Sequence, residues 1–190
     1  VGFVLHTVLP LEPSIVALLG AGLLVLVSGL PTETYMREVE WETLLFFAGL
    51  FVMVGALVEV GAIDAVADAL VAATGGEIGR AVPLVLFGSG VLSAIVDNIP
   101  YVTTMAPVVD QLVASGPMAD QTVLWWALAL GADLGGNATA IGASANVVVL
   151  GIAKRNGYPI TFWEFTKYGL VVAGVTVLLC YPYLWLRYLV

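Results

Sequence analysis

Residues 93–104, SAIVDNIPYVTT, place an acid and an amide, Asp97 and Asn98, side by side within an apolar region. Sixteen uncharged residues precede Asp97, and twelve follow it before Asp110. A helix needs ~20 apolar residues to cross a bilayer, so neither arm is long enough to cross by itself. The two short arms therefore favour a re-entrant helical hairpin over residues 81–114, which enters and leaves the membrane on one side and has its tip at or near DNIP.

The composition is that of a membrane protein. The chain is 61% hydrophobic and 11% charged, and its mean hydropathy is +1.03. Soluble domains are roughly 45–50% apolar and ~25% charged. We therefore predict an all-α integral membrane protein whose main surroundings are the lipid bilayer. The net charge of −8 is spread over short loops without a basic run, which argues against nucleic acid as a partner.

The order of apolar and polar stretches predicts how residues 1–190 are organised. Apolar runs at 13–30 and 41–61 are long enough to span a membrane. The predicted segments are scaffold-like spans at 1–61, an interfacial helix at 62–80, the re-entrant hairpin at 81–114, a broken helix at 122–155 and a final span at 160–190.

Residues 62–76, AIDAVADALVAATGG, have the pattern of an amphipathic helix. Asp64 and Asp68 lie four residues apart on one face. The opposite face is predicted to contain Ile63, Val66, Ala67, Leu70 and Val71. The helix is closed by Gly75 and Gly76, and such a helix is expected to lie along the membrane interface.

The basic residues predict an orientation. If 13–30, 41–61 and 122–155 each cross once and 81–114 does not, four basic residues share one side. These four are Arg37, Lys154, Arg155 and Lys167. Arg80 and Arg187 then lie on the other side. Because cytoplasmic loops carry an excess of Lys and Arg, we expect a multi-pass protein of the plasma or inner membrane whose hairpin enters from the outer side.

A second helix break is predicted at 131–146, GADLGGNATAIGASAN. We interpret four glycines as permitting an unwound stretch there: Gly131, Gly135, Gly136 and Gly142. Non-helical backbone at membrane depth must be buried in protein or line a water-filled cavity. A carboxylate such as Asp97 or Asp133 at that depth is costly without a partner and indicates function.

These two breaks define a candidate site for an ion or substrate. Exposed carbonyls and side-chain oxygens at broken helices hold cations, and helix N-termini hold anions. The candidate residues are Asp97, Asn98, Thr103, Asp133, Asn137, Thr139, Ser144 and Asn146. Sodium is proposed at Asn98, Asn137 and Asn146. No cofactor is expected beyond a coupling ion, Na⁺ or H⁺.

Three stretches resemble the ion transporter superfamily, in particular its branch of arsenite permeases and D-type sodium–proton antiporters with a citrate-transporter-like domain. They are residues 39–63 (VEWETLLFFAGLFVMVGALVEVGAI), 93–109 (SAIVDNIPYVTTMAPVV) and 124–169 (LWWALALGADLGGNATAIGASANVVVLGIAKRNGYPITFWEFTKYG). The resemblance implies two inverted repeats, each with a re-entrant hairpin and a broken helix whose tips meet near the membrane midplane. This chain resembles the C-terminal repeat. A missing N-terminal half or a homodimer partner is therefore expected.

The resemblance implies a secondary active ion transporter that works by alternating access. The sodium–dicarboxylate branch has Ser-Asn-Thr at its hairpin tips, whereas this tip reads Asp-Asn-Ile-Pro, which favours a cation- or proton-coupled role. Sodium–proton antiport and permeation of arsenite or another small anion both remain open, and no enzyme activity is expected. The alternatives are an intramembrane aspartyl protease with Asp97 and Asp133 as its dyad, and a non-catalytic membrane scaffold subunit.

Overall fold

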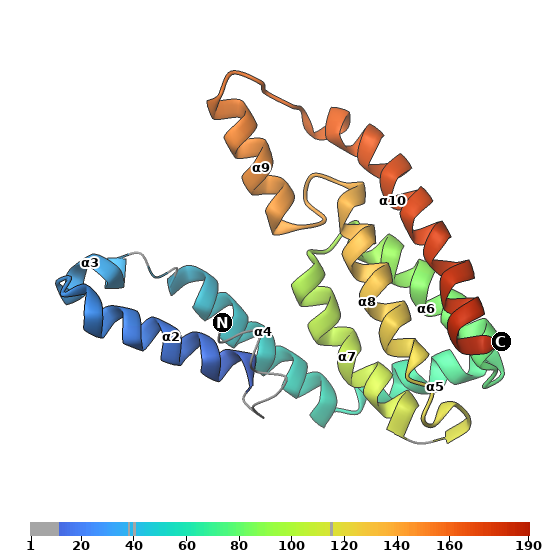
Figure 1. Cartoon of the computed structure of the whole chain (residues 1–190). Coiled ribbons are helices and arrows are strands. Elements are labelled where there is room, and N and C mark those ends of the chain that lie inside the picture. The colour runs from blue at the N-terminus through green and yellow to red at the C-terminus, as the bar shows by residue number, and fades with distance from the viewer. Residues whose placement is uncertain (1–11, 38, 40, 115) are drawn as a thin grey trace. The chain divides into compact units, whose positions relative to one another are not determined.

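The computed structural model describes residues 12–37, 39, 41–114 and 116–190, and within them every regular element is a helix (Figure 1). The α-helices are α2 (Pro13–Ser28), α3 (Thr32–Arg37), α4 (Trp41–Glu59), α5 (Ala62–Thr74), α6 (Ile78–Ser93), α7 (Asn98–Ala114), α8 (Val123–Gly135), α9 (Ser144–Arg155) and α10 (Phe162–Leu184). Three short helical turns complete the description: η1 (Gly116–Met118), η2 (Gly136–Ala138) and η3 (Trp185–Leu189). The predicted all-α fold is confirmed.

Helix lengths bear on which segments cross a membrane. Among the described residues, one continuous helix, Phe162–Leu189, is long and apolar enough to cross. The pair Leu44–Glu59 and Ala62–Thr74 passes the same test together, but it is bent by 67° at Gly61 and its neighbours. Helices α2 and α6 are apolar but only 16 residues long each. The predicted crossing of 13–30 therefore stays a prediction.

The chain divides into two compact units, residues 1–47 and 48–190. In the first unit, α2 begins with Pro13 in its first turn and ends at Gly29, whose φ is +62°. None of the side chains of α2 is buried, in line with an apolar helix that awaits lipid or protein neighbours. The first eleven residues of the predicted scaffold region lie outside the described residues.

The second unit contains the core. Helix α8 packs against α6 along its length, and α7 and α10 also pack against α8. The side chains that fill the space between these helices are large and almost fully buried: Val82, Leu86, Val109, Leu124 and Leu128. Burial of this kind stabilises a fold by about 1.5–3 kcal/mol for each side chain in water. The helices that carry the two predicted breaks are therefore held together by one core.

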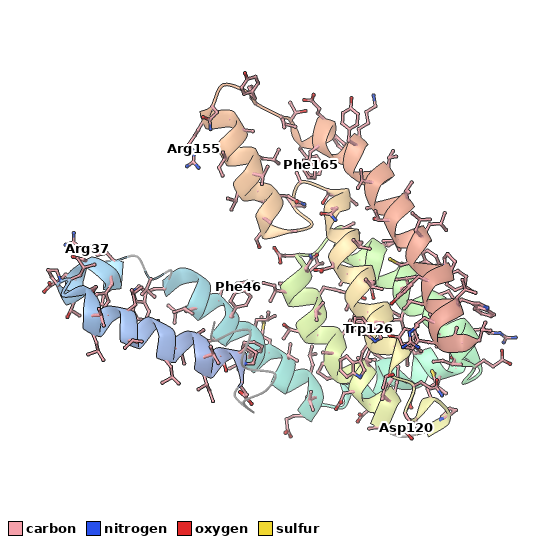
Figure 2. The ribbon with its side chains drawn as sticks, in the orientation of Figure 1. Arg37, Phe46, Asp120, Trp126, Arg155 and Phe165 are labelled. Atoms are coloured by element: carbon pink, nitrogen blue, oxygen red, sulfur yellow. The ribbon has the colours of Figure 1, made fainter. Side chains whose placement is uncertain are left out.

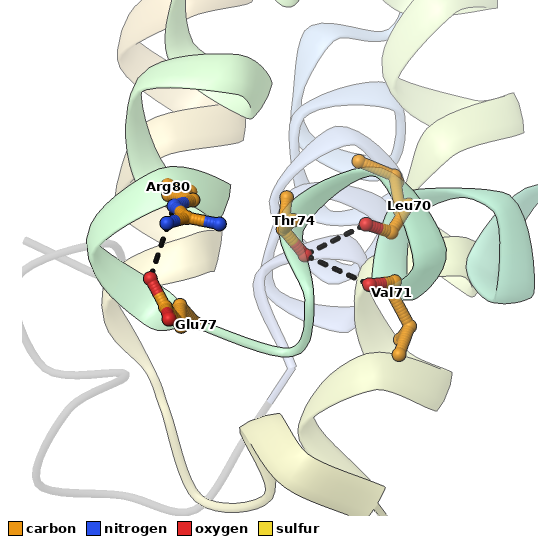
Figure 3. Close-up of polar contacts among 5 residues, drawn as sticks. All are labelled: Leu70, Val71, Thr74, Glu77 and Arg80. Atoms are coloured by element: carbon orange, nitrogen blue, oxygen red, sulfur yellow. Dashed lines mark hydrogen bonds and ion pairs between the residues drawn. The ribbon is translucent and has the colours of Figure 1, made fainter.

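Helix α5 ends earlier than the interfacial helix predicted at 62–80. It stops at Thr74 because Gly75 and Gly76 take φ values of +66° and +74°. Figure 3 shows this turn, where the Thr74 hydroxyl donates to the carbonyl of Leu70 (2.7 Å). Past the turn, Arg80 and Glu77 form an ion pair at 3.0 Å in the first turn of α6.

The apolar face predicted for α5 is largely confirmed, with one correction. Ile63 and Ala67 are buried, and Leu70 and Val71 pack against the same core. Val66 was placed on that face but is 43% exposed. Asp64 and Asp68 are exposed as predicted.

Helices α6 and α7 form a hairpin. Across it, the Tyr101 hydroxyl donates to Ser89 Oγ at 3.0 Å, and both residues are buried. The outer ends also meet, since a Cβ added at Gly76 would lie 2.9 Å from the ring of Pro117. Residues 76 and 117 flank the two arms, so the arms start and finish at the same place.

Helix α6, the first arm of the hairpin, lies antiparallel alongside α10. A Cβ at Gly79 would lie 3.9 Å from Trp185, and one at Gly90 would lie 3.6 Å from Val177. At the tip, Ala94 forms a small buried cluster with Ala138 and Ala173. Ala173 is at the middle of α10, so the tip of the hairpin is level with the middle of that helix.

The broken helix consists of α8, the short turn η2, an irregular stretch at 139–143 and α9. Gly135 and Gly136 have φ values of −63° and −57°, which are helical. The glycines with positive φ among the described residues are Gly29, Gly61, Gly75, Gly76, Gly116 and Gly157. Of the four glycines interpreted as permitting an unwound stretch, Gly131 and Gly135 lie in α8, Gly136 lies in η2, and Gly142 lies in the irregular stretch. Figure 2 shows Arg155 and Asp120 at opposite ends of this second unit.

Candidate ion-binding site

The two helix breaks are joined by hydrogen bonds between their backbones and side chains. Thr139, in the irregular stretch after η2, donates from its hydroxyl to the carbonyl of Ala94 at the end of α6 (2.6 Å). Ser144, the first residue of α9, donates from its hydroxyl to the carboxylate of Asp97. Each of these two bonds connects one tip to the other. The first uses a backbone carbonyl at the end of α6, where the helix supplies no partner, and the second uses the side chain of Asp97.

Asn98, the first residue of α7, lies at the centre of this junction. Its amide nitrogen lies within hydrogen-bond distance of three acceptors, Ser93 Oγ (2.5 Å) and the carbonyl oxygens of Ala132 (3.1 Å) and Gly142 (3.0 Å), which its two hydrogens share. The orientation of the amide follows from these neighbours, because two of the three are carbonyl oxygens that can only accept. Asn98 therefore connects α6, α8 and the stretch before α9.

Ser93 was missed by the sequence analysis. It is fully buried, accepts from the Asn98 amide and donates its own proton to the carbonyl of Ala132 at 2.8 Å. The sequence contains a weak signal for it, a hydroxyl residue in the last turn of an apolar helix, just before the polar tip. Many such serines only bond their own helix, so the signal does not distinguish this one.

Asp97 is half-buried and sits where two helices begin. Its Oδ1 accepts from the backbone N–H of Ile99 (3.2 Å), and Oδ2 accepts from Ser144. The N-termini of α7 and α9 both carry partial positive charge, and a carboxylate is favoured there. The tip therefore places the carboxylate of Asp97 between two helix N-termini.

Asn146 fixes the irregular stretch between η2 and α9. Its amide nitrogen donates to the carbonyls of Gly136 and Thr139, each at 2.9 Å. The Thr139 carbonyl also accepts from the backbone N–H of Gly142 (3.3 Å), so the Asn146 amide adds a second donor to this turn. Asn146 also leaves its own amide oxygen as an acceptor.

Several glycines allow the tips to approach closely, which is the role that the structure gives them. A Cβ at Gly135 would lie 2.5 Å from the Cα of Gly90, and one at Gly142 would lie 2.6 Å from the carbonyl oxygen of Gly136. Gly169 of α10 faces the η2 backbone in the same way, with Ala138 O at 2.8 Å from a Cβ there. Backbones that approach this closely leave no room for a side chain.

Three of the eight predicted site residues make none of these contacts between the tips. The Thr103 hydroxyl donates to the carbonyl of Ile99 in its own helix (2.7 Å). Asn137 is exposed and lines a cavity of about 540 Å³ beside α10, together with Glu164 and Tyr168. Asp133 is exposed and lies inside α8, so its description as a buried acid in a helix break is wrong. The other five, Asp97, Asn98, Thr139, Ser144 and Asn146, are brought together.

The chemistry of this junction suits a hard cation. Its groups are carboxylate, amide, hydroxyl and backbone carbonyl oxygens, which alkali and alkaline-earth ions prefer. Within the part of the chain that the structure describes, no three His, Cys, Asp or Glu side chains gather in the way a transition metal requires. Of the three asparagines proposed for sodium, Asn98 and Asn146 belong to the junction. The side chain of Asn137 takes no part in the hydrogen bonds that join the two tips.

The fold and site thus define a helical protein with two broken elements joined at polar tips. Residues 1–131 match the citrate transporter (CitMHS) family. The chain belongs to this family, which confirms the predicted membership of the superfamily and implies a membrane location. No solved structure matches the chain.

Named relatives agree with this membership. The chain is 59% identical over 189 residues to an uncharacterized transporter of Mycobacterium tuberculosis, covering 99% of this chain and 44% of the relative. It is 56% identical over 191 residues to the 46 kDa membrane protein of Mycobacterium leprae, covering 100% and 44%. It is 43% identical over 175 residues to the P protein of Homo sapiens, covering 87% and 21%. The chain spans less than half the length of these relatives.

Proposed function

We propose that this chain provides one half of a secondary active ion transporter of the cell membrane, which works by alternating access and is coupled to sodium or protons. Membership of a transporter family and relatives that are named as transporters support transport over enzymatic chemistry. The binding residues in this proposal are Asp97, Asn98, Thr139, Ser144 and Asn146. The substrate itself, whether sodium, arsenite or an anion such as citrate, is left to the assay.

The observation that carries the proposal is the junction of the two helix breaks around Asp97. A broken helix in a membrane exposes carbonyls and N–H groups that need partners, and each unsatisfied group costs several kcal/mol. Here hydrogen bonds at the two breaks satisfy some of the exposed backbone carbonyls. A carboxylate and amide oxygens remain at the junction. Such half-helix ends at the membrane midplane are the usual binding site in secondary transporters.

The position of the hairpin supports a re-entrant geometry. Helix α10 has 23 residues, which corresponds to about 34 Å at 1.5 Å per residue and matches a bilayer core of ~30 Å. The tip at Ala94 packs at Ala173, halfway along α10, and the outer ends meet at Gly76 and Pro117. If α10 crosses the membrane, the hairpin enters from the side of Trp185, reaches the middle and returns.

The built-in carboxylate supports cation coupling. An anionic substrate that approaches the N-termini of α7 and α9 meets Asp97 already placed there. A sodium ion or proton on Asp97 removes that repulsion, so binding of the cation would favour binding of an anion. Symport of a cation with an anion, and exchange of sodium for protons, are both consistent with this arrangement.

The test is Asp97→Asn in the full-length protein, reconstituted in vesicles with imposed sodium and proton gradients. The substitution keeps the shape and removes the charge. Coupled flux should fall at least about tenfold, because a charge-assisted interaction is worth roughly 1.5–3 kcal/mol. The matched control is Asp120→Asn: Asp120 is exposed, with φ of +63°, a conformation that asparagine also accepts. Unchanged coupled flux in Asp97→Asn would overturn the proposal.

A further inference from the structure

Gly136, the first residue of η2, differs from the other glycines that pack closely around the junction. At four of these glycines the atom nearest to an added Cβ is a backbone atom: Gly131, Gly135, Gly142 and Gly169. At Gly136 the three nearest atoms all belong to the side chain of Asn98. Gly136 therefore decides where a side chain can lie, whereas the other four decide how closely two backbones approach.

The amide of Asn98 occupies the space that a side chain at position 136 would take. A Cβ there would lie 2.9 Å from Cγ of Asn98, and closer still to one of its two terminal amide atoms. Carbon atoms in contact are ordinarily ~3.5–4.0 Å apart, so an alanine would displace the amide by about 0.6–1.1 Å. The backbone itself accepts alanine, because the φ of Gly136 is −57°, which is a helical value.

The hydrogen bonds of Asn98 determine which of its amide atoms is available to a ligand. Three partners surround its nitrogen: Ser93 Oγ and the carbonyl oxygens of Ala132 and Gly142. Among the described residues, these partners leave the amide oxygen as an acceptor, and an acceptor binds a cation rather than an anion. Asn146 is arranged in the same way, because its nitrogen donates to two backbone carbonyls and its oxygen remains.

We propose that Gly136 is a positioning residue of the cation site: it leaves room for the Asn98 amide and so allows the amide oxygen to bind sodium. This inference rests on the proposed function and deepens it by naming sodium as the ion at that oxygen. A binding site must hold its ligands within ~0.5 Å of the productive geometry, so the displacement by alanine is large enough to remove the Asn98 oxygen from the ion. The displaced amide would also lose its alignment with two backbone carbonyls.

Titration of flux with sodium tests this proposal. The full-length protein is reconstituted in vesicles, and the sodium concentration that gives half-maximal flux is measured for the wild type, Gly136→Ala and the control Gly88→Ala. A Cβ at Gly88, in α6, would have no atom within 4 Å. Gly136→Ala should raise the half-maximal concentration at least about tenfold, equivalent to ~1.4 kcal/mol, and Gly88→Ala should leave it unchanged. The same half-maximal concentration in Gly136→Ala as in the wild type would overturn the proposal.

A double-mutant cycle tests whether Gly136 acts through Asn98. The unfolding temperature in detergent is measured for Gly136→Ala in the wild type and in an Asn98→Ala background, where the amide that it would displace is absent. Gly136→Ala should lower the unfolding temperature of the wild type but not that of Asn98→Ala. Gly135→Ala, whose Cβ would meet the backbone of Gly90, should lower both. An equal loss for Gly136→Ala in the two backgrounds would show that this glycine serves packing alone and would contradict the proposal.

The outcomes separate this inference from the proposed function. Loss of coupled flux in Asp97→Asn, together with an unchanged sodium dependence in Gly136→Ala, would refute the role of Gly136 and leave the proposed function standing. A wild-type flux that does not depend on sodium would refute the assignment of the Asn98 oxygen and leave proton coupling. If Gly136→Ala does not fold although Asn98→Ala does, the double variant decides: its folding supports the contact between the two residues, and its failure to fold refutes it.

Discussion

Gly135 lies where α8 passes close to α6, and its lack of a side chain helps to set how near the two helices come. A Cβ there would lie 2.5 Å from the Cα of Gly90, a distance that no real structure tolerates without movement. The contact is between backbones, so no flexible side chain can move aside. The close approach brings Ser93 within reach of Ala132, which the junction needs.

We therefore predict that Gly135→Ala destabilises the full-length protein by about 1–3 kcal/mol, the usual cost of overpacking. Thermal unfolding in detergent, followed by scanning fluorimetry, measures the effect. The control is Gly151→Ala, where an added Cβ meets no atom within 4 Å and helix propensity improves by about 1 kcal/mol. An unfolding temperature for Gly135→Ala at or above that of Gly151→Ala would contradict this account.

The hydroxyls of Thr139 and Thr103 offer a matched comparison at the same scale. Thr139 connects the two tips through the carbonyl of Ala94, whereas Thr103 bonds the carbonyl of Ile99 in its own helix. Thr139→Val should cost about 1–3 kcal/mol because a carbonyl at the junction loses its donor. Thr103→Val should cost less, since the helix keeps its backbone bonds. Denaturation of the two variants side by side decides the matter, and equal losses would refute the distinction.

At the scale of elements, the hairpin of α6 and α7 makes a prediction about sidedness. Glu77 and Pro117 flank its two arms. Pro117 lies against Gly76, and Glu77 is the residue that follows Gly76. Single cysteines at these positions, in a Cys180→Ala background, should label with a membrane-impermeant reagent from the same face of intact cells. Ser115, which directly follows the predicted hairpin, lies outside the described residues, so Pro117 is used for the second arm.

The control for this labelling is a cysteine at Asn156, an exposed position between α9 and α10. It follows Lys154 and Arg155, so we expect it to label from the cytoplasmic face only. The broken helix α8–α9 then crosses once and the hairpin does not cross. Labelling of Glu77→Cys and Pro117→Cys from opposite faces would disprove a re-entrant hairpin.

At the scale of the whole molecule, the junction needs further protein. The chain spans 44% of its mycobacterial relatives, and Asp97 and the amides beside it are only half-buried within it. Polar groups of this kind cost several kcal/mol each when they face hydrocarbon. We propose that a second repeat, from a missing half or another copy, covers them.

The corresponding prediction concerns residues 1–190 expressed alone. In detergent, they should associate as a dimer or aggregate when followed by size-exclusion chromatography with light scattering. Ion flux in vesicles should appear only when the remaining part of the full-length protein is co-expressed. A monodisperse monomer that transports ions in liposomes would contradict both the shared site and the inverted-repeat interpretation.

The sequence by itself determined the helical fold, the order of the segments and the positions of the two breaks. These depend on the lengths of apolar runs and on nearby residues such as Pro100 and Gly75, which act within a few positions along the chain. The family could be identified for the same reason, because its motifs are continuous. The exposure of Asp133 depends on its neighbours in space and was predicted wrongly, and the predicted segment 62–80 runs past the end of α5 at Thr74 into the first turn of α6.

Only the tertiary structure decided which polar groups meet and what the glycines do. Ser93 bonds a carbonyl 39 residues away, Thr139 one 45 residues away, and Asp97 is bonded by a serine 47 residues away. No periodic pattern encodes such pairs, since each depends on how closely two helices approach. That approach is set by backbone contacts at Gly135 and Gly142, where the missing side chain matters only once another backbone lies against it.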